Sequence, residues 1–179
     1  YFYAALTTHH SLLTTHHSLF FPNFLPQSTN MEVKNLFDPA VKQEIITRIN
    51  NLSPQSTRQW GKMDVAQMLA HLQQPLEVAL GKRTINGGFF MNLILPLFKK
   101  TLWDDNPWKK GLPTDATYIT TGKIKEFTTE KAALLELISQ FQEKDVNLEK
   151  HPVFGRMTKE QWSKSAWKHI DHHLKQFGA

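Results

Sequence analysis

The chain of 179 residues has the length of a single domain, and its content of 40% hydrophobic and 21% charged residues is ordinary for a globular protein. Its 21 basic and 16 acidic residues give a formal net charge of +5 and are spread along every predicted helix, which argues against a nucleic-acid interface. The absence of cysteine excludes disulfides, thiolate ligands and a cysteine nucleophile, and it fits a reducing compartment, so we expect a cytoplasmic protein. Any metal must be held by His, Asp or Glu.

The first thirty residues differ in composition from the rest. Residues 1–30 contain no Lys, Arg, Asp or Glu, and the heptapeptide LTTHHSL occurs there twice in succession. The segment lacks the basic start and the unbroken apolar centre of a signal peptide. We therefore expect a leader outside the domain over residues 1–30, whose four histidines bind metal only non-specifically, and one domain over residues 31–179.

A first amphipathic helix is predicted to begin after Asp38. The dipeptide Asp38-Pro39 is typical of an N-cap followed by proline at the first helical position. Apolar residues then recur every three or four positions as far as Asn51, where the pattern ends.

A second helix is predicted within residues 60–80. Asp64 is its expected N-cap, and Pro75 is expected to bend it. His71 falls at the edge of its apolar side. A lone histidine there is more often a surface or hydrogen-bonded residue than a ligand, although imidazole is the commonest metal ligand.

Residues 81–127 show no sustained periodicity. The apolar run at 89–97 contains Pro96 and is too short to span a bilayer, which takes about 20 apolar residues. A short buried helix is the simplest expectation. A lid over a pocket or a contact in a homodimer is the alternative.

A long irregular connection is predicted over residues 103–121, where two proline-containing turns occur. Trp108, Lys109 and Lys110 in this connection would suit an anionic substrate. A solvated charged loop is the simpler interpretation.

Two further helices complete the prediction. Thr128 or Thr129 is the expected cap of the third, and Thr158 with Gln161 forms a capping box at the start of the fourth, which Gly178 ends. We find no convincing strand. The fold class predicted is therefore all-α, an antiparallel four-helix bundle whose long connection between the second and third helices includes a short extra helix.

The fourth helix carries three histidines in the run QWSKSAWKHIDHHLKQFG. His169 and His173 are four residues apart, so they share one face of a helix. At about 100° per residue, His173 falls inside the apolar stripe and His169 at its margin. His172 falls on the opposite side with Lys168, so we expect it to face water.

A bundle would bring His71 toward His169 and His173, because metal sites in bundles are built from facing helices. Three neutral imidazoles suit Zn²⁺, Ni²⁺ or Fe²⁺ and leave at least one position open for water or substrate. His151, in the turn before the fourth helix, is a candidate proton carrier or fourth ligand. A histidine in a turn more often fixes the turn through hydrogen bonds to the backbone.

Two histidine-bearing strings, GKMDVAQMLAHL at 61–72 and KHIDHHLKQFG at 168–178, resemble the DinB-like superfamily of metal-dependent four-helix bundles. With HPVFG at 151–155, the chain looks most similar to an uncharacterised bacterial branch of that superfamily, over residues 31–179. The resemblance implies a divalent metal held by His71, His169 and His173.

The same resemblance implies thiol-dependent S-transferase or hydrolase-type chemistry on a small molecule, with a low-molecular-weight thiol as cosubstrate. The metal would act by lowering the pKa of a bound thiol or water. We expect no nucleic-acid and no membrane partner.

Two alternatives remain: a non-catalytic metal-binding or stress-related bundle, and an interaction module with packed histidines. The enzyme predicts a sizeable pocket beside residues 103–121. If the chain is a binding protein, we expect a Trp or Phe over the open side of the metal. If it is an interaction module, we expect imidazoles that do not converge.

Overall fold

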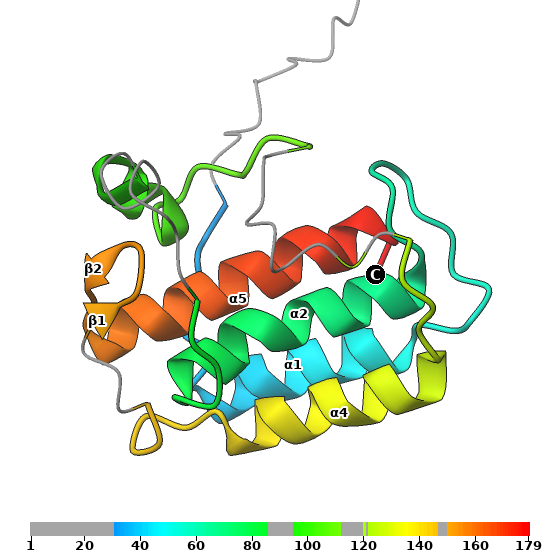
Figure 1. The fold of residues 1–179 in the computed structure, drawn as a ribbon, viewed down its shortest axis with the longest axis horizontal. Helices are drawn as coiled ribbons and strands as arrows, with labels where there is room; N and C mark the ends of the chain where they lie inside the picture. The colour runs from blue at the N-terminus through cyan, green and yellow to red at the C-terminus, as the bar shows by residue number, and fades with distance from the viewer. Residues whose placement is uncertain (1–30, 86–94, 112–119, 121, 147–149) are drawn as a thin grey trace, which may run out of the picture.

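The computed structural model describes residues 31–85, 95–111, 120, 122–146 and 150–179. The expected leader and most of the apolar run at 89–97 lie outside these ranges. The described part of the chain is mainly helical (Figure 1). Its elements are α1 (Pro39–Asn50), α2 (Val65–Ala79), the 3₁₀-helix η1 (Leu95–Leu102), α4 (Phe127–Gln140), β1 (Lys150–His151), β2 (Gly155–Arg156) and α5 (Lys159–Gln176).

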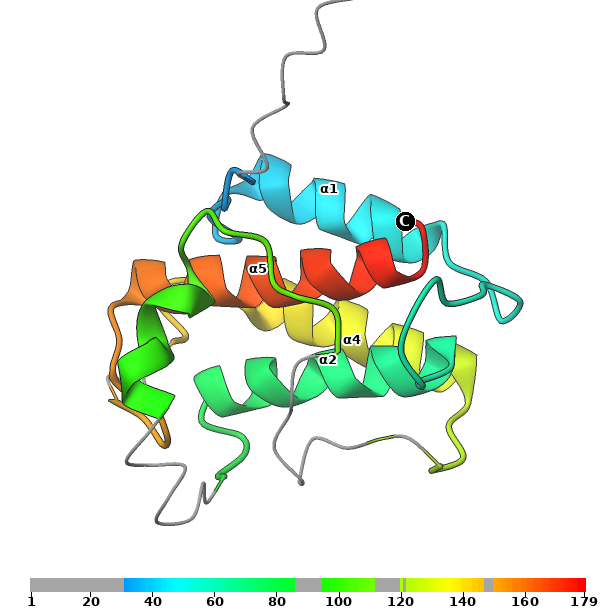
Figure 2. The same ribbon diagram turned by 90° about the horizontal axis from the view of Figure 1, so that it is seen from above.

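The four α-helices lie side by side with roughly aligned axes in both views (Figures 1 and 2). Helix α2 contacts α4 and α5, and α1 contacts the same two helices, so each helix has two neighbours. The side chains between them form one apolar core, to which each helix contributes fully buried residues: Ile45 and Ile49, Met68, Leu69, Leu72 and Leu76, Leu134 and Ile138, and Ile170 and Leu174. None of the described helices has the length and apolar character needed to cross a membrane.

Helix starts follow the predicted caps in three cases. The carboxylate of Asp38 accepts from the first turn of α1, and capping boxes open α2 at Asp64 and α5 at Thr158. These caps are confirmed, and so is Gly178 as the stop after α5, where its φ is +73°. Because a cap is a bond between near neighbours, the local sequence is enough to predict it.

The predicted cap of the third helix is wrong. Glu126, not Thr128 or Thr129, is the N-cap of α4, and its carboxylate accepts from the backbone N–H groups of both threonines at 3.0 and 2.6 Å. These backbone hydrogen bonds lower the pKa of Glu126 to about 2. Shorter side chains are the usual caps, but the longer side chain of Glu126 also reaches the N–H groups of the first turn.

Two expectations for the connecting regions also need correction. A hairpin of two-residue strands pairs Lys150 with Arg156 and His151 with Gly155, although no strand was predicted. Strands this short show no alternation in sequence. The extra helix between α2 and α4 is present as η1, but its residue Leu97 is 81% exposed, so the described end of the apolar run is not buried.

Candidate metal centre

Three histidines from two helices converge. The Nε2 atoms of His71 on α2 and His169 on α5 lie 3.0 Å apart. One ring nitrogen from each of His71, His169 and His173 lies within 4.8 Å of the others. Metal–nitrogen bonds of about 2.0–2.1 Å at octahedral or tetrahedral angles require donor separations of about 2.9–3.4 Å. The closest pair meets that requirement, and the third ring nitrogen lies near enough that the group could hold one divalent cation.

His71 lies deeper than its sequence position predicts. It is 4% exposed rather than at the edge of the helix, because α2 packs against α4 on one side and α5 on the other. His169 and His173 are half-buried on the side of α5 that faces α2, which confirms their predicted orientation. Two facing helices thus supply the group.

His172 does not point into water as predicted. It is half-buried, with its ring 5.9 Å from that of Trp60 and 5.7 Å from that of Trp108. Both tryptophans belong to loops that fold over α5, which a helical wheel cannot include. His172 is nonetheless not a member of the converging group.

The environment keeps the grouped imidazoles of α5 neutral. Burial lowers the pKa of His169 well below its usual 6.5, and repulsion from the neighbouring histidines adds to the effect. Burial and repulsion from His71 lower the pKa of His173 to about 3. A metal ligand must be neutral imidazole, so at neutral pH no proton has to leave either ring before a cation binds.

Gln176 fixes the orientation of His173. Its side-chain nitrogen donates to the carbonyl of Trp60 at 2.7 Å, which turns its Oε1 toward His173 Nδ1 at 2.8 Å. The Nδ1–H of His173 therefore donates to Gln176, and Nε2 keeps its lone pair for a metal. Gly61 leaves room for this amide: its φ is +82°, and a Cβ there would collide with Gln176 Nε2.

The comparisons with known proteins supply no activity. A family model described as a protein of unknown function, DUF1569, matches residues 120–179, about a third of the chain. The match spans α4, the hairpin and α5, and so includes His169 and His173 but not His71. No curated protein and no solved structure matches the chain.

Replacing Gln176 tests whether orientation of His173 matters. We expect Gln176→Met to weaken Zn²⁺ binding about 10–100-fold, the usual cost of removing a residue that orients a ligand. Gln176→Glu keeps an acceptor for Nδ1–H but loses the donor to the Trp60 carbonyl, so its affinity should fall between those of the methionine variant and the parent. Competition with a chromogenic chelator measures both affinities; equal values for the methionine variant and the parent would contradict the assignment.

His151 lies in the hairpin and not in the converging group. Its Nδ1 accepts from the backbone N–H groups of Val153 and Phe154 at 3.0 and 3.2 Å, and its ring stacks on Trp162. Burial lowers its pKa to about 4, so the ring is neutral and carries its proton on Nε2. His151 thus fixes the turn, as the simpler interpretation predicts, and its role as a proton carrier stays a prediction.

Aromatic and basic residues surround the group on the α5 side. The ring of Trp108 lies 5.8 Å from that of His169, and Lys110 Nζ lies 4.5 Å from the centre of the Trp60 ring. Pockets near the start of α1 and the end of α4 contain none of the three histidines. Much of the connection beside which a substrate pocket was predicted, residues 112–119 and 121, lies outside the described residues.

The most prominent residue that the sequence did not reveal is Lys168. It was predicted to face water, yet it is 1% exposed. Its Nζ donates to the carbonyl of Thr101 at 2.8 Å and to the carbonyl and carboxylate of Asp104, each at 2.7 Å. No local pattern marks these partners, because they lie more than sixty residues away.

Proposed function

We propose that this chain is a metal-dependent protein that binds one divalent cation through His71, His169 and His173. The observation that carries the proposal is the 3.0 Å approach of His71 Nε2 to His169 Nε2 within a group of three histidines. In the metal-free chain this separation is that of an N–H···N hydrogen bond between two neutral imidazoles, which a cation bound by both Nε2 atoms would replace. Zn²⁺, Ni²⁺ and Fe²⁺ are the ions that three imidazoles suit.

We further propose that the four helices form an antiparallel bundle of the DinB-like kind. The cyclic contacts of α1, α4, α2 and α5 and the placement of one ligand on α2 and two on α5 support this assignment. On this basis the protein is a thiol-dependent S-transferase or a hydrolase that acts on a small molecule. Three ligands leave a coordination position in which the cation would lower the pKa of water or a thiol.

The residues of the chain then have separate tasks. His71, His169 and His173 hold the cation, and Gln176 keeps Nε2 of His173 turned toward it. Lys110, which is exposed near Trp60, offers a positive charge to an anionic group of the substrate. Trp108 supplies an apolar surface beside His169.

A panel assay tests the catalytic part. The protein is loaded in turn with Zn²⁺, Ni²⁺ and Fe²⁺ and mixed with glutathione or cysteine and 1-chloro-2,4-dinitrobenzene, and the S-aryl product is followed by absorbance. We expect turnover that depends on the metal and is lost in His169→Ala. Stoichiometric metal binding without turnover for any ion or thiol tested would contradict the S-transferase and favour the binding protein.

A non-catalytic metal-binding or stress-related protein is the second candidate. The observation that favours it is Trp108, whose ring lies beside both His169 and His172 and covers that side of the group. Adding azide to the Co²⁺-loaded protein discriminates between the enzyme and the non-catalytic binding protein. A change in the visible spectrum indicates an open position, and an unchanged spectrum indicates a closed one.

A further inference from the structure

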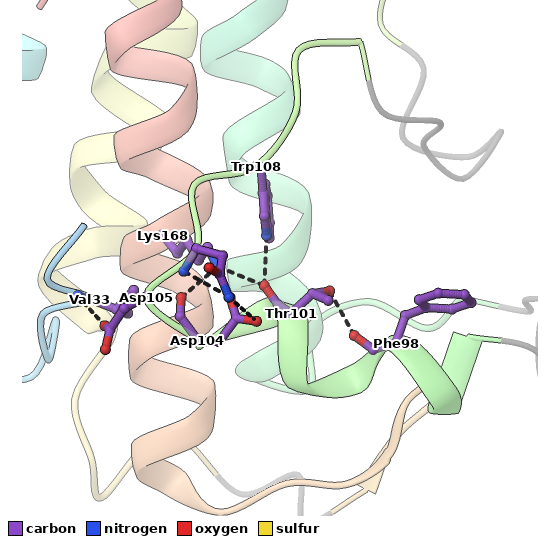
Figure 3. Close-up of polar contacts among 8 residues, drawn as sticks. Val33, Phe98, Thr101, Asp104, Asp105, Trp108 and Lys168 are labelled. Atoms are coloured by element: carbon purple, nitrogen blue, oxygen red, sulfur yellow. Dashed lines mark hydrogen bonds and ion pairs between the residues drawn. The ribbon is translucent and has the colours of Figure 1, made fainter. Parts of the chain in front are cut away.

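Lys168 fastens the end of η1 to α5, directly beside a metal-site histidine. It precedes His169 in the chain, and all three of its ammonium hydrogens have acceptors in residues 101–104 (Figure 3). The Asp104 carboxylate balances its charge at 2.7 Å. Removing one partner of a buried ion pair leaves an uncompensated charge, so residues 101–104 cannot leave α5 at low cost.

The carbonyl of Thr101 links this ion pair to Trp108. It accepts from Lys168 Nζ at 2.8 Å and from the indole Nε1–H of Trp108 at 2.7 Å. The indole is thereby held with its ring 5.8 Å from His169 and 5.7 Å from His172. Lys168 Nζ also lies 5.7 Å from the centre of the Trp108 ring. A continuous set of contacts thus runs from the buried ammonium to the side of the metal group.

We propose that Lys168 is a positioning residue that holds Trp108 as a wall on the His169 side of the metal site. A ligand that enters from this side must pack an apolar or flat group against the indole while its donor atom reaches the cation. This inference rests on the proposed metal site. It adds that access to the site is controlled by a residue whose side chain does not bind the metal.

The rate of metal release tests the inference without any enzymatic assay. The full chain is loaded with Co²⁺ and mixed with excess chromogenic chelator. We expect Lys168→Met and Trp108→Ala each to release Co²⁺ about tenfold faster, within the range typical of coupled neighbouring residues. Because both changes remove the same wall, the double variant should also be about tenfold faster, not about a hundredfold.

Lys164→Met is the matched control. Lys164 lies one turn earlier on α5 and pairs with Glu160 in a more exposed i,i+4 ion pair, so its replacement should leave the rate unchanged. If Lys168→Met folds poorly, Asp104→Asn takes its place. This change loosens the same ion pair from its partly exposed side, and it should also release Co²⁺ about tenfold faster. Parental rates in both single variants, or additive effects in the double variant, would overturn the inference.

A failure of the proposed metal site can be distinguished from a failure of the positioning role of Lys168. A parent that binds no Co²⁺ contradicts the proposed function, and acrylamide quenching of Trp108 then decides the positioning claim. The fluorescence of Trp108 is obtained by subtracting the emission of Trp108→Phe from that of the parent. We expect this signal to be quenched more strongly in the Lys168→Met background; equal quenching would overturn the role of Lys168 without reference to metal.

Discussion

Replacement of His169 by alanine is expected to abolish stoichiometric metal binding and to weaken affinity for Zn²⁺ by more than about 100-fold. Changing a residue that merely orients a ligand costs about 10–100-fold, so removing one of three ligands should cost more. His169 Nε2 also lies 3.0 Å from Nε2 of His71, within the donor separation that one cation requires. Chelator competition and calorimetry on the purified variant measure the loss.

His172→Ala is the control on the same helix. Its ring is half-buried between Trp60 and Trp108 but does not belong to the converging group, so we expect affinity within a few-fold of the parent. If His169→Ala and His172→Ala weaken binding equally, the assignment of ligands to one face of α5 is wrong.

The metal-free protein is expected to lose about 6 kcal/mol of folding free energy between pH 7 and pH 5 through three of its histidines. His151, His169 and His173 have lowered pKa values in the folded chain, chiefly through burial. The unfolded chain therefore binds protons first as the pH falls below about 6.5, and stability is fully present only above that value. Each group that stays neutral to pH 5 contributes about 2 kcal/mol to the loss.

The loss should continue down to the folded pKa values, about 4 for His151 and about 3 for His173. Because typical total stabilities are about 5–15 kcal/mol, acid alone should approach unfolding. Urea unfolding at the two pH values, followed by far-ultraviolet circular dichroism, gives the difference. His151→Gln should reduce the pH dependence by about 2 kcal/mol, and equal stability of the parent at pH 7 and pH 5 would contradict the prediction.

The features that sequence alone predicted are those set by neighbours along the chain. The caps at Asp38, Asp64 and Thr158 are bonds within one helical turn. The inward orientation of His169 and His173 follows from helical periodicity. Local patterns of this kind are therefore sufficient to predict the mainly helical fold and these two candidate ligands.

The features that sequence missed depend on contacts between distant segments. His71 is buried because α2 has two helical neighbours, and a wheel drawn for one helix cannot show this. Lys168 is buried because the end of η1 supplies three acceptors for its ammonium, which a charge pattern on α5 does not reveal. The partner of Gln176, the carbonyl of Trp60, likewise lies 116 residues away in the sequence.

Metal content, determined by elemental mass spectrometry, tests the central claim most directly. The full chain is purified without an affinity tag, with His9, His10, His16 and His17 replaced by asparagine so that the histidines of residues 1–30 do not contribute. We predict close to one equivalent of Zn, Ni or Fe per chain, lost in His71→Ala and in His173→Ala. Absence of metal after incubation with each ion, with both alanine variants as stable as the parent, would contradict the claim and leave the three histidines as packed structural residues.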